Sequence, residues 1–186
     1  MHTYPPSCAS LAVQRTSGFR STAISTFAAA LLAIVASGCA NQPTATSGTS
    51  LTEQEATSLI EPLYGALAAT SPADVTRLLQ SVTSPRWVNC SSNDFCEDRS
   101  AVLTRWTRRI DAIPDFKWVL KEMIVSGNHI VVRGEDTGTP SGTFLGIPHD
   151  GRSFRIMTID IHTVEQGRLV RSVHLEDWAT AMRQIR

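Results

Sequence analysis

A change in the spacing of apolar residues near Pro114 constrains this fold more than any other feature of the sequence. Before Pro114, apolar residues recur at the three- and four-residue spacing of amphipathic helices. From Phe116 onward they fall into short alternating runs bounded by turn residues, as in strands. Helices followed by a run of strands are typical of an α+β domain, in which helices cover one face of an antiparallel sheet.

Three helices are expected before this change. The first begins at a capping box formed by Thr52 and Glu55 and continues past Pro62, because the apolar stripe does not stop there. The second begins at Ser71-Pro72. The third covers about 100–110, and a short fourth helix begins near residue 177 and ends the chain.

Four strands are expected after it, in two hairpins: 116–125 with 129–137, and 153–164 with 169–177. The second turn contains Gln166 and Gly167. A two-residue turn would require positive φ at Gln166, which is unfavourable, so a three-residue turn with Gly167 alone in the left-handed region is expected. This turn would pair Val164 with Arg168.

The expected register gathers ionisable side chains on one face of this hairpin. It places Asp160 opposite Ser172 and Thr158 opposite His174, so Asp160 and His174 lie one diagonal apart and could act as an acid/base pair. The alternative is that the two form a structural pair or are exposed. His162, near the strand end, is expected to be peripheral. Candidate substrate contacts on the same face are Phe154, Ile156, Thr158, Ser172 and Trp178.

The other face of the hairpin is also apolar. It is expected to carry Met157, Ile159, Ile161, Leu169, Val173 and Leu175. Two such faces could form a sheet-to-sheet homodimer, or the face could pack under the C-terminal helix.

The N-terminus has the features of an export signal. Arg15 and Arg20 precede an apolar run, 27–36, that is too short to span a bilayer comfortably, and Ser37-Gly38-Cys39 follows. The junction resembles a bacterial lipobox, which would make Cys39 the lipidated first residue of the mature chain. An ordinary secretory cleavage nearby, leaving a plain thiol, is the alternative. We therefore expect an export signal in 1–38, a lipidated cysteine and flexible tether in 39–50, and one domain in 51–186.

Composition and cysteines narrow the function further. Removing the leader takes away two of 17 basic residues and none of 17 acidic ones. The near-neutral remainder lacks the excess positive charge that is typical of nucleic-acid-binding proteins. Cys90 and Cys96 lie in a polar segment and are expected to form a small-loop disulfide in an oxidising compartment. A metal site would need further ligands, and none is close in sequence. No metal and no cofactor is expected.

Several segments in the second half of the chain form a recognisable pattern: 113–118, 133–139, 142–148, 151–154, 159–162, 167–170 and 174–178. Together they resemble the SnoaL-like polyketide cyclase (ester cyclase) family, and the resemblance extends more weakly over 51–186. It implies the cone of the nuclear-transport-factor-2-like superfamily, in which N-terminal helices and a curved antiparallel sheet enclose a pocket.

The resemblance also implies chemistry, because family cyclases use an aspartate as general acid/base in an intramolecular aldol ring closure. Asp160 matches the place of that aspartate. The expected activity is proton abstraction α to a carbonyl, with a small apolar or carbonyl-containing ligand as partner. A non-catalytic pocket protein of the cell envelope is the competing expectation, and the sequence does not separate a hydrolase or isomerase that uses the same acid.

Overall fold

The computed structural model describes residues 50–148 and 150–186. The expected export signal, Cys39 and the tether up to residue 49 lie outside these residues. Four helices and six strands follow in the order α1 (Glu53–Leu67), α2 (Pro72–Val82), β1 (Thr83–Cys90), β2 (Cys96–Asp98), α3 (Arg99–Ala112), β3 (Lys117–Ser126), β4 (His129–Gly138), β5 (Phe154–Glu165), β6 (Arg168–Glu176) and α4 (Trp178–Gln184). The predicted helices and the four predicted strands are confirmed, with ends within about two or three residues.

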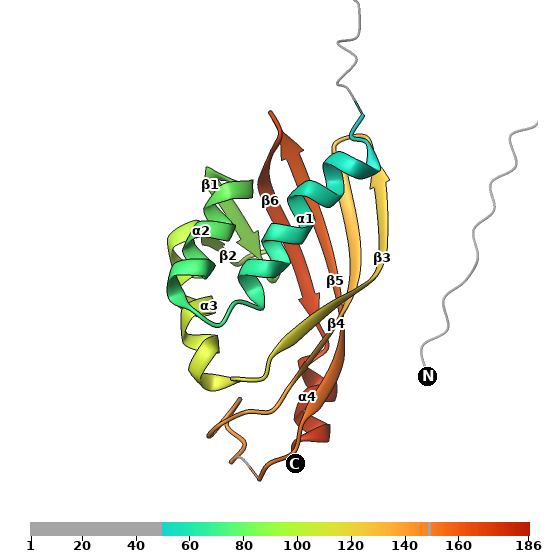
Figure 1. The fold of residues 1–186 in the computed structure, drawn as a ribbon. Helices are drawn as coiled ribbons and strands as arrows, with labels where there is room; N and C mark the ends of the chain where they lie inside the picture. The colour runs from blue at the N-terminus through green and yellow to red at the C-terminus, as the bar shows by residue number, and fades with distance from the viewer. Residues whose placement is uncertain (1–49, 149) are drawn as a thin grey trace, which may run out of the picture. The chain divides into compact units, whose positions relative to one another are not determined.

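The six strands form one curved, open sheet in the order β2-β1-β6-β5-β4-β3. Helices α1, α2 and α3 lie on one side of it, and α4 lies at the end of the sheet where β5 begins (Figure 1). The α+β class is therefore confirmed. The predicted strands β3 to β6 pair antiparallel as expected, and the sheet departs from that pattern only where β1 pairs with β6 in the parallel direction. Strands β1 and β2 were not predicted at all.

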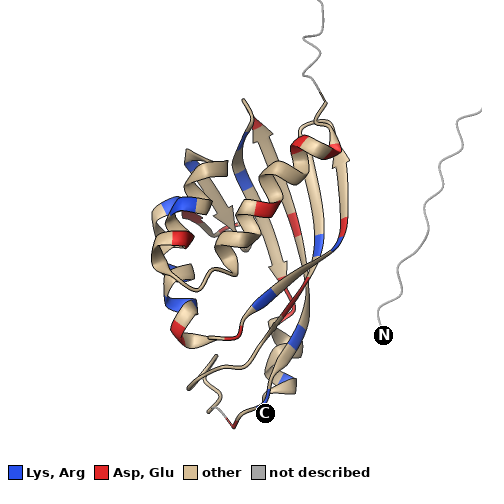
Figure 2. Ribbon diagram, viewed as in Figure 1, with Lys and Arg blue, Asp and Glu red and all other residues tan. Residues whose placement is uncertain are grey.

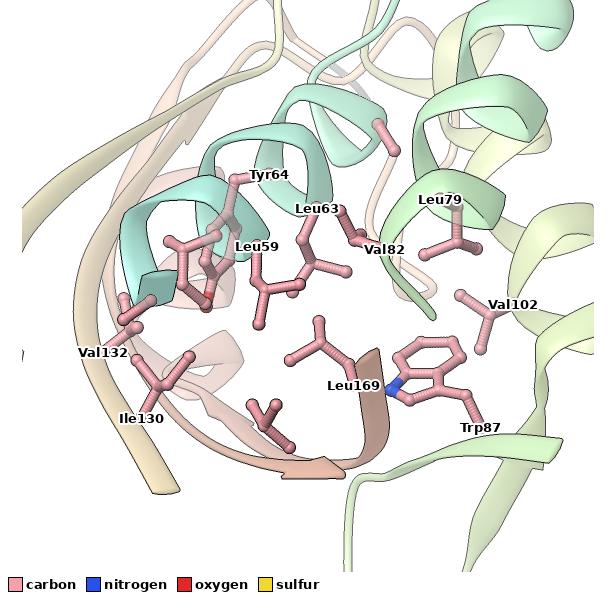
Figure 3. Close-up of a cluster of buried hydrophobic side chains, with 14 of the residues drawn as sticks. Leu59, Leu63, Tyr64, Leu79, Val82, Trp87, Val102, Ile130, Val132 and Leu169 are labelled. Carbon is pink, nitrogen blue, oxygen red and sulfur yellow. The ribbon is translucent and has the colours of Figure 1, made fainter. Parts of the chain in front are cut away.

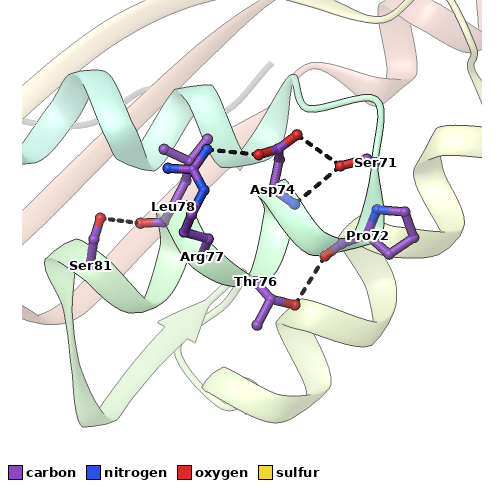
Figure 4. A network of polar contacts seen from close by, with 7 residues as sticks. All are labelled: Ser71, Pro72, Asp74, Thr76, Arg77, Leu78 and Ser81. Carbon is purple, nitrogen blue, oxygen red and sulfur yellow. Dashed lines mark hydrogen bonds and ion pairs between the residues drawn. The ribbon is translucent and has the colours of Figure 1, made fainter.

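Local capping fixes where the first two helices begin. Thr52 and Glu55 form the expected capping box of α1. At α2, the Ser71 hydroxyl accepts from the backbone N–H of Asp74 at 3.2 Å and donates to its carboxylate at 2.8 Å. Arg77 then forms an ion pair with Asp74 at 2.7 Å (Figure 4). These contacts satisfy helix N–H groups that have no partner within the helix.

The main hydrophobic core lies between the helices and the sheet. Leu59 and Leu63 of α1 meet Leu79 of α2, Trp87 of β1 and Leu169 of β6 in one cluster (Figure 3). Burial of this many large apolar side chains is the dominant favourable contribution to folding. The cluster fixes α1 over the middle of the sheet, which positions the helix end that carries Tyr64.

The absence of a side chain at Gly134 of β4 leaves room for the Trp118 ring of β3. A Cβ at Gly134 would lie 2.4 Å from Nε1 of Trp118 and 2.7 Å from the hydroxyl oxygen of Thr158. The space is used by the Trp118 ring, which stacks on Tyr64 with centroids 3.5 Å apart and planes 5° from parallel. A side chain at Gly134 would therefore displace the stack that holds Tyr64 in place.

The turn between β5 and β6 differs from the expected one. Glu165 pairs with Arg168, which leaves a two-residue turn with φ of 50° at Gln166 and 70° at Gly167. These are the positive values that a type I′ turn requires. The prediction of a three-residue turn was wrong, because the flanking strands impose a conformation that Gln166 alone disfavours.

A register shift between Thr163 and Val164 also changes which residues face each other. Asp160 lies directly opposite His174, Thr158 opposite Glu176, and His162 opposite Ser172. The predicted pairs of Asp160 with Ser172, Thr158 with His174, and Val164 with Arg168 were therefore wrong. Leu169, expected on the outer face, lies fully buried in the core.

The predicted disulfide between Cys90 and Cys96 is present and joins β1 to β2. Charged positions of both signs are interspersed over the helices and strands in the view of Figure 2. Within the described part of the chain, no helix is long and apolar enough to cross a membrane.

Candidate active site

Alternation along β5 and β6 brings six polar side chains to the inner face of the sheet. On β5 the inward residues include Thr158, Asp160 and His162, all buried; on β6 they are Ser172, His174 and Glu176. Because directly paired residues of antiparallel strands project to the same side, the six form three facing pairs. The site therefore depends on the observed register.

These side chains line an inner cavity of about 30 Å³ beneath α1. A volume of that size has room for about one water molecule. The wall combines aromatic rings with ionisable groups: Leu63, Tyr64, Leu67, Trp87, Asn89, Arg105, Trp106, Trp118, Asp136, Thr158, Asp160, His162, Ser172, His174 and Glu176.

Asp160 is the buried acid that sequence reasoning identified. Its side chain is 8% exposed, and burial raises its pKa to about 7. A hydrogen bond from the Tyr64 hydroxyl opposes that rise because it stabilises the carboxylate, whereas the nearby charge of Glu176 adds to it. Near neutral pH, Asp160 can therefore both accept and release a proton.

Asp136 of β4 is a second buried acid, which the sequence analysis missed. It is fully buried, and neither carboxylate oxygen has a hydrogen-bond partner among the described residues. Burial raises its pKa to about 8, assisted by the charges of Glu176 and Asp160 and opposed by Arg109. Its position could have been found, because Ile130, Val132 and Asp136 fall on the same inward alternation of β4.

His174 faces both Asp160 and Glu176. Its Nδ1 lies 3.9 Å from Oε2 of Glu176, and its Nε2 is buried without a hydrogen-bond partner in the described residues. Burial lowers the pKa of His174, and the Glu176 charge opposes this shift. The predicted pairing of His174 with Asp160 on one wall is thus present in the structure, and the unpartnered Nε2 leaves the ring free to bond a ligand.

A series of hydrogen bonds leads to Asp160 along the inner face of the sheet, beginning at Trp87 of β1. The indole Nε1 of Trp87 donates to the Ser172 hydroxyl at 3.0 Å, which lies 2.7 Å from Nδ1 of His162. Nε2 of His162 lies 3.1 Å from the Tyr64 hydroxyl. Burial lowers the pKa of His162 to about 3, so the ring is neutral and carries one proton.

One arrangement of protons satisfies this whole chain. Ser172 donates to Nδ1 of His162, Nε2–H donates to Tyr64, and Tyr64 donates to Asp160. Ser172, predicted to contact substrate, thus has its proton committed to His162. His162, predicted to be peripheral, is instead 1% exposed and central to the site; that prediction was wrong because the register places it against Ser172.

The other predicted contacts divide between different regions. Thr158 lines the inner cavity and accepts a hydrogen bond of 3.4 Å from Nε1 of Trp118. Phe154 and Ile156 pack in a second hydrophobic cluster with α4. Trp178, on the first turn of α4, donates to Glu176 at 2.6 Å and lines a second cavity.

This outer cavity is larger, at about 320 Å³. Leu67, Arg105, Trp106 and Glu176 line both cavities, which are therefore adjacent. The remaining wall of the outer cavity consists of Arg108, Arg109, Ala112, Ile113, Phe116, Phe144, Leu145 and Trp178. Its size lies at the lower end of the range for small-molecule sites. No group of three or more metal-ligating side chains suited to a metal ion is found within residues 50–148 and 150–186.

The chain belongs to the SnoaL-like polyketide cyclase family, whose model matches residues 67–185. A search of curated protein sequences gives no match to this chain. Membership confirms the family resemblance seen in the sequence, and the solved structures described next confirm the nuclear-transport-factor-2-like fold.

Solved structures similar to this one share its fold. TsrD from Streptomyces laurentii is 24% identical, with a TM-score of 0.63 over 73% of this chain and 97% of TsrD. IdmH from Streptomyces antibioticus, a putative polyketide cyclase, is 24% identical, with a TM-score of 0.60 over 70% of this chain and 97% of IdmH. An LEH-like epoxide hydrolase from M. tuberculosis is 11% identical, with a TM-score of 0.54 over 71% of this chain and 90% of that protein. At these identities the likeness shows the fold alone.

The unpartnered carboxyl of Asp136 predicts a pH-dependent cost to stability. Its pKa is about 8 when folded and about 4 when unfolded. Between these pH values folding must take up a proton at Asp136. The contribution of this carboxyl to the free energy of unfolding is therefore fully present below about pH 4 and is lost as pH rises to 8. Asp136→Asn should therefore be more stable than wild type at pH 8 by about 2–5 kcal/mol, with the difference fading toward pH 4.

Urea unfolding of both proteins between pH 4 and pH 8 measures this difference. Asp111→Asn, at an exposed position on α3, is the matched control and should change stability little at any pH. A difference between Asp136→Asn and wild type that is independent of pH would contradict the assignment of a raised pKa to Asp136.

Proposed function

We propose that the protein is an acid/base enzyme that removes a proton α to a carbonyl, with Asp160 as the base. The proposal rests on the environment of the Asp160 carboxyl. It is buried on a cavity wall opposite His174, and burial raises its pKa to about 7. An aspartate at its ordinary pKa of about 4 is too weak a base for a carbon acid. Burial strengthens it as a base, and at a pKa of about 7 a large fraction of Asp160 is still ionised at neutral pH.

The neighbouring groups fit the remaining steps. Asp160 takes the α-proton, and the electrons of the C–H bond form an enolate. The protonated carboxyl of Asp136 or the free Nε2 of His174 stabilises the enolate oxygen by donating a hydrogen bond. Asp160 then returns the proton to another carbon, which is an isomerisation. Alternatively, the enolate carbon attacks a carbonyl of the same molecule, and the resulting alkoxide takes up the proton, which is a ring closure.

The Asp160→Asn variant tests the base. Exchange of α-protons for deuterium in a panel of ketones and β-keto esters, followed by NMR, measures the first step without knowledge of the natural substrate. Asp160→Asn should lower the exchange rate about 10²–10⁴-fold, because general base catalysis contributes this much. Unchanged exchange in a variant that remains folded would refute the proposal.

The pH profile of the same reaction follows from the two acids. Asp160 must be ionised, so kcat/KM should rise as pH passes about 7; if Asp136 must be protonated, kcat/KM should fall above about 8. Because Asp160 and Asp136 influence each other's ionisation, the rising and falling parts of the profile give pKa values of the pair and not of each residue alone. In Asp136→Asn the alkaline limb should disappear.

Two other functions fit the two cavities. A non-catalytic binding protein needs only the apolar outer cavity, and it should show ligand affinity that Asp160→Asn leaves intact and no exchange in wild type. A hydrolase would hold a water in the inner cavity, whose size suits one, with Asp160 as its base. The likeness to an epoxide hydrolase structure makes epoxides a reasonable addition to the panel.

We propose further that the protein is exported and anchored by lipid at Cys39. The support is the basic, apolar and small-residue order of 1–38. The Cys90–Cys96 disulfide suits an oxidising compartment outside the cytoplasm. Metabolic labelling with an alkynyl fatty acid should mark the wild-type chain and not Cys39→Ser. Export with no label on wild type would favour ordinary secretion.

The outer face of the sheet supports a homodimer. Its exposed apolar side chains include Val119, Ile124, Met157, Ile159, Ile161, Val173 and Leu175. The alternative, that the C-terminal helix covers this face, was wrong: Ala181 and Ile185 pack with Phe154 and Ile156, which face the other way. An exposed apolar face of this kind is typical of an interaction surface.

Sedimentation at several concentrations tests the dimer. Wild type should sediment as a dimer, and Ile159→Lys should shift it toward monomer, because the substitution would bury an unpaired charge in the interface. Thr104→Lys, at an exposed position on α3, is the control and should leave the dimer unchanged. A monomeric wild type would remove the proposal.

A further inference from the structure

The outer cavity has a charge distribution that the proposed proton transfer does not use. Most of its wall is apolar, from Leu67, Trp106, Phe116, Phe144 and Trp178 among others. Its charged residues are three arginines and one glutamate. A cavity that pairs an apolar body with clustered positive charge is suited to a ligand that is apolar and anionic.

The three arginines come from one face of α3. Arg105, Arg108 and Arg109 stand at positions i, i+3 and i+4, which adjoin each other on a helix surface. All three line the outer cavity. Like charges at these spacings repel each other, so the arrangement disfavours the ligand-free helix and is relieved by an anion.

The three differ in how far their charge is already compensated. Arg105 forms an ion pair with Glu97 at 2.9 Å. Within the described residues, Arg108 and Arg109 have no ion pair. Arg109 donates from Nη2 to the backbone oxygen of Ala69, and its guanidinium lies 5.0 Å from the ring centroid of Phe116.

The Arg109 guanidinium is held in place but keeps unused hydrogen-bonding capacity. Its Nε is buried and lacks an acceptor among the described residues. Burial lowers the pKa of Arg109 and the charge of Asp136 opposes this shift. Because Asp136 is protonated below about pH 8, it gives little compensation at neutral pH.

The single acid of the outer cavity does not cancel this charge. Glu176 is engaged by Trp178, whose Nε1 donates to it at 2.6 Å, and by the nearby Nδ1 of His174. Glu176 also lines the inner cavity together with Asp160. Negative charge therefore lies at the inner end, from Glu176 and the ionised form of Asp160, and positive charge lies at the α3 end.

We propose that the ligand of this cavity is a small apolar carboxylic acid, whose carboxylate binds Arg108 and Arg109 of α3. Its uncharged end points past Leu67 and Trp106 toward the inner cavity. The opposite orientation is disfavoured, because it would place the carboxylate against Glu176 and the ionised form of Asp160 in a buried like-charge contact. The proposal rests on the proposed function only in assigning that uncharged end to the reacting carbonyl; the binding itself does not depend on it.

A matched pair of probes separates charge from apolar contact. Cinnamate and methyl cinnamate share one aromatic body, and only cinnamate carries a carboxylate. Isothermal titration calorimetry on the full-length chain should give cinnamate an affinity at least about tenfold higher than the ester, because a charge-assisted hydrogen bond contributes that much. Raising the salt concentration should weaken cinnamate only.

Four variants locate the interaction. Arg108→Gln, at an exposed position where folding is insensitive to the change, should weaken cinnamate about tenfold. Arg109→Gln should weaken it about tenfold to a hundredfold. Both should leave the ester within about twofold. Arg86→Gln, an exposed arginine of β1 outside the cavity wall, should change neither probe. Ala112→Phe fills the outer cavity and should abolish both.

Three results would overturn the proposal. They are equal affinity for the two probes, absence of cinnamate binding in the millimolar range, and persistence of cinnamate binding in Ala112→Phe. Asp160→Asn distinguishes this failure from failure of the proposed enzyme, because it should stop proton exchange and leave cinnamate binding intact. If exchange survives in that variant while the arginine variants lose cinnamate, the enzyme proposal fails and the ligand class stands.

Discussion

The hydrogen-bond chain from Trp87 through Ser172, His162 and Tyr64 to Asp160 is the constraint on which the rest of the site depends. Each of these groups is buried, and a buried polar group without a partner costs about 1–3 kcal/mol. The series of hydrogen bonds gives each of these groups a partner and joins β1, β6, β5 and α1. Because its last member donates to a carboxylate, the fold holds a negative charge at a depth where burial alone would disfavour it.

Burial of Asp136 destabilises the fold, because no comparable series of hydrogen bonds reaches its carboxyl group. Its oxygens lack partners among the described residues, and two further acids lie nearby. The large apolar cluster between α1 and the sheet offsets this cost. An unsatisfied group kept in a well-packed core is the arrangement expected where function, rather than stability, determines the residue.

Local signals made most of the fold predictable. The caps at Thr52 and Ser71 and the alternation along β3 to β6 act over a few residues, so the sequence shows them directly. Strand β1 was missed because Pro85 and its polar neighbours lack such a signal, and its parallel partner β6 lies far along the chain. Asp160 was predicted from motif and pattern together. Its partners were not, since the two-residue turn at Gln166 and the register shift between Thr163 and Val164 each move the facing pairs by one residue.

The parallel contact between β1 and β6 also governs when folding can finish. Thr83 pairs with Leu169, so β1 has no place in the sheet until almost the whole chain has left the ribosome. Contacts between residues so distant in sequence form slowly, because a large loop must close first. Until Leu169 is available, the edge of β1 that pairs with β6 has no partner. The topology therefore makes the last strands of the chain a requirement for closing the first part of the sheet.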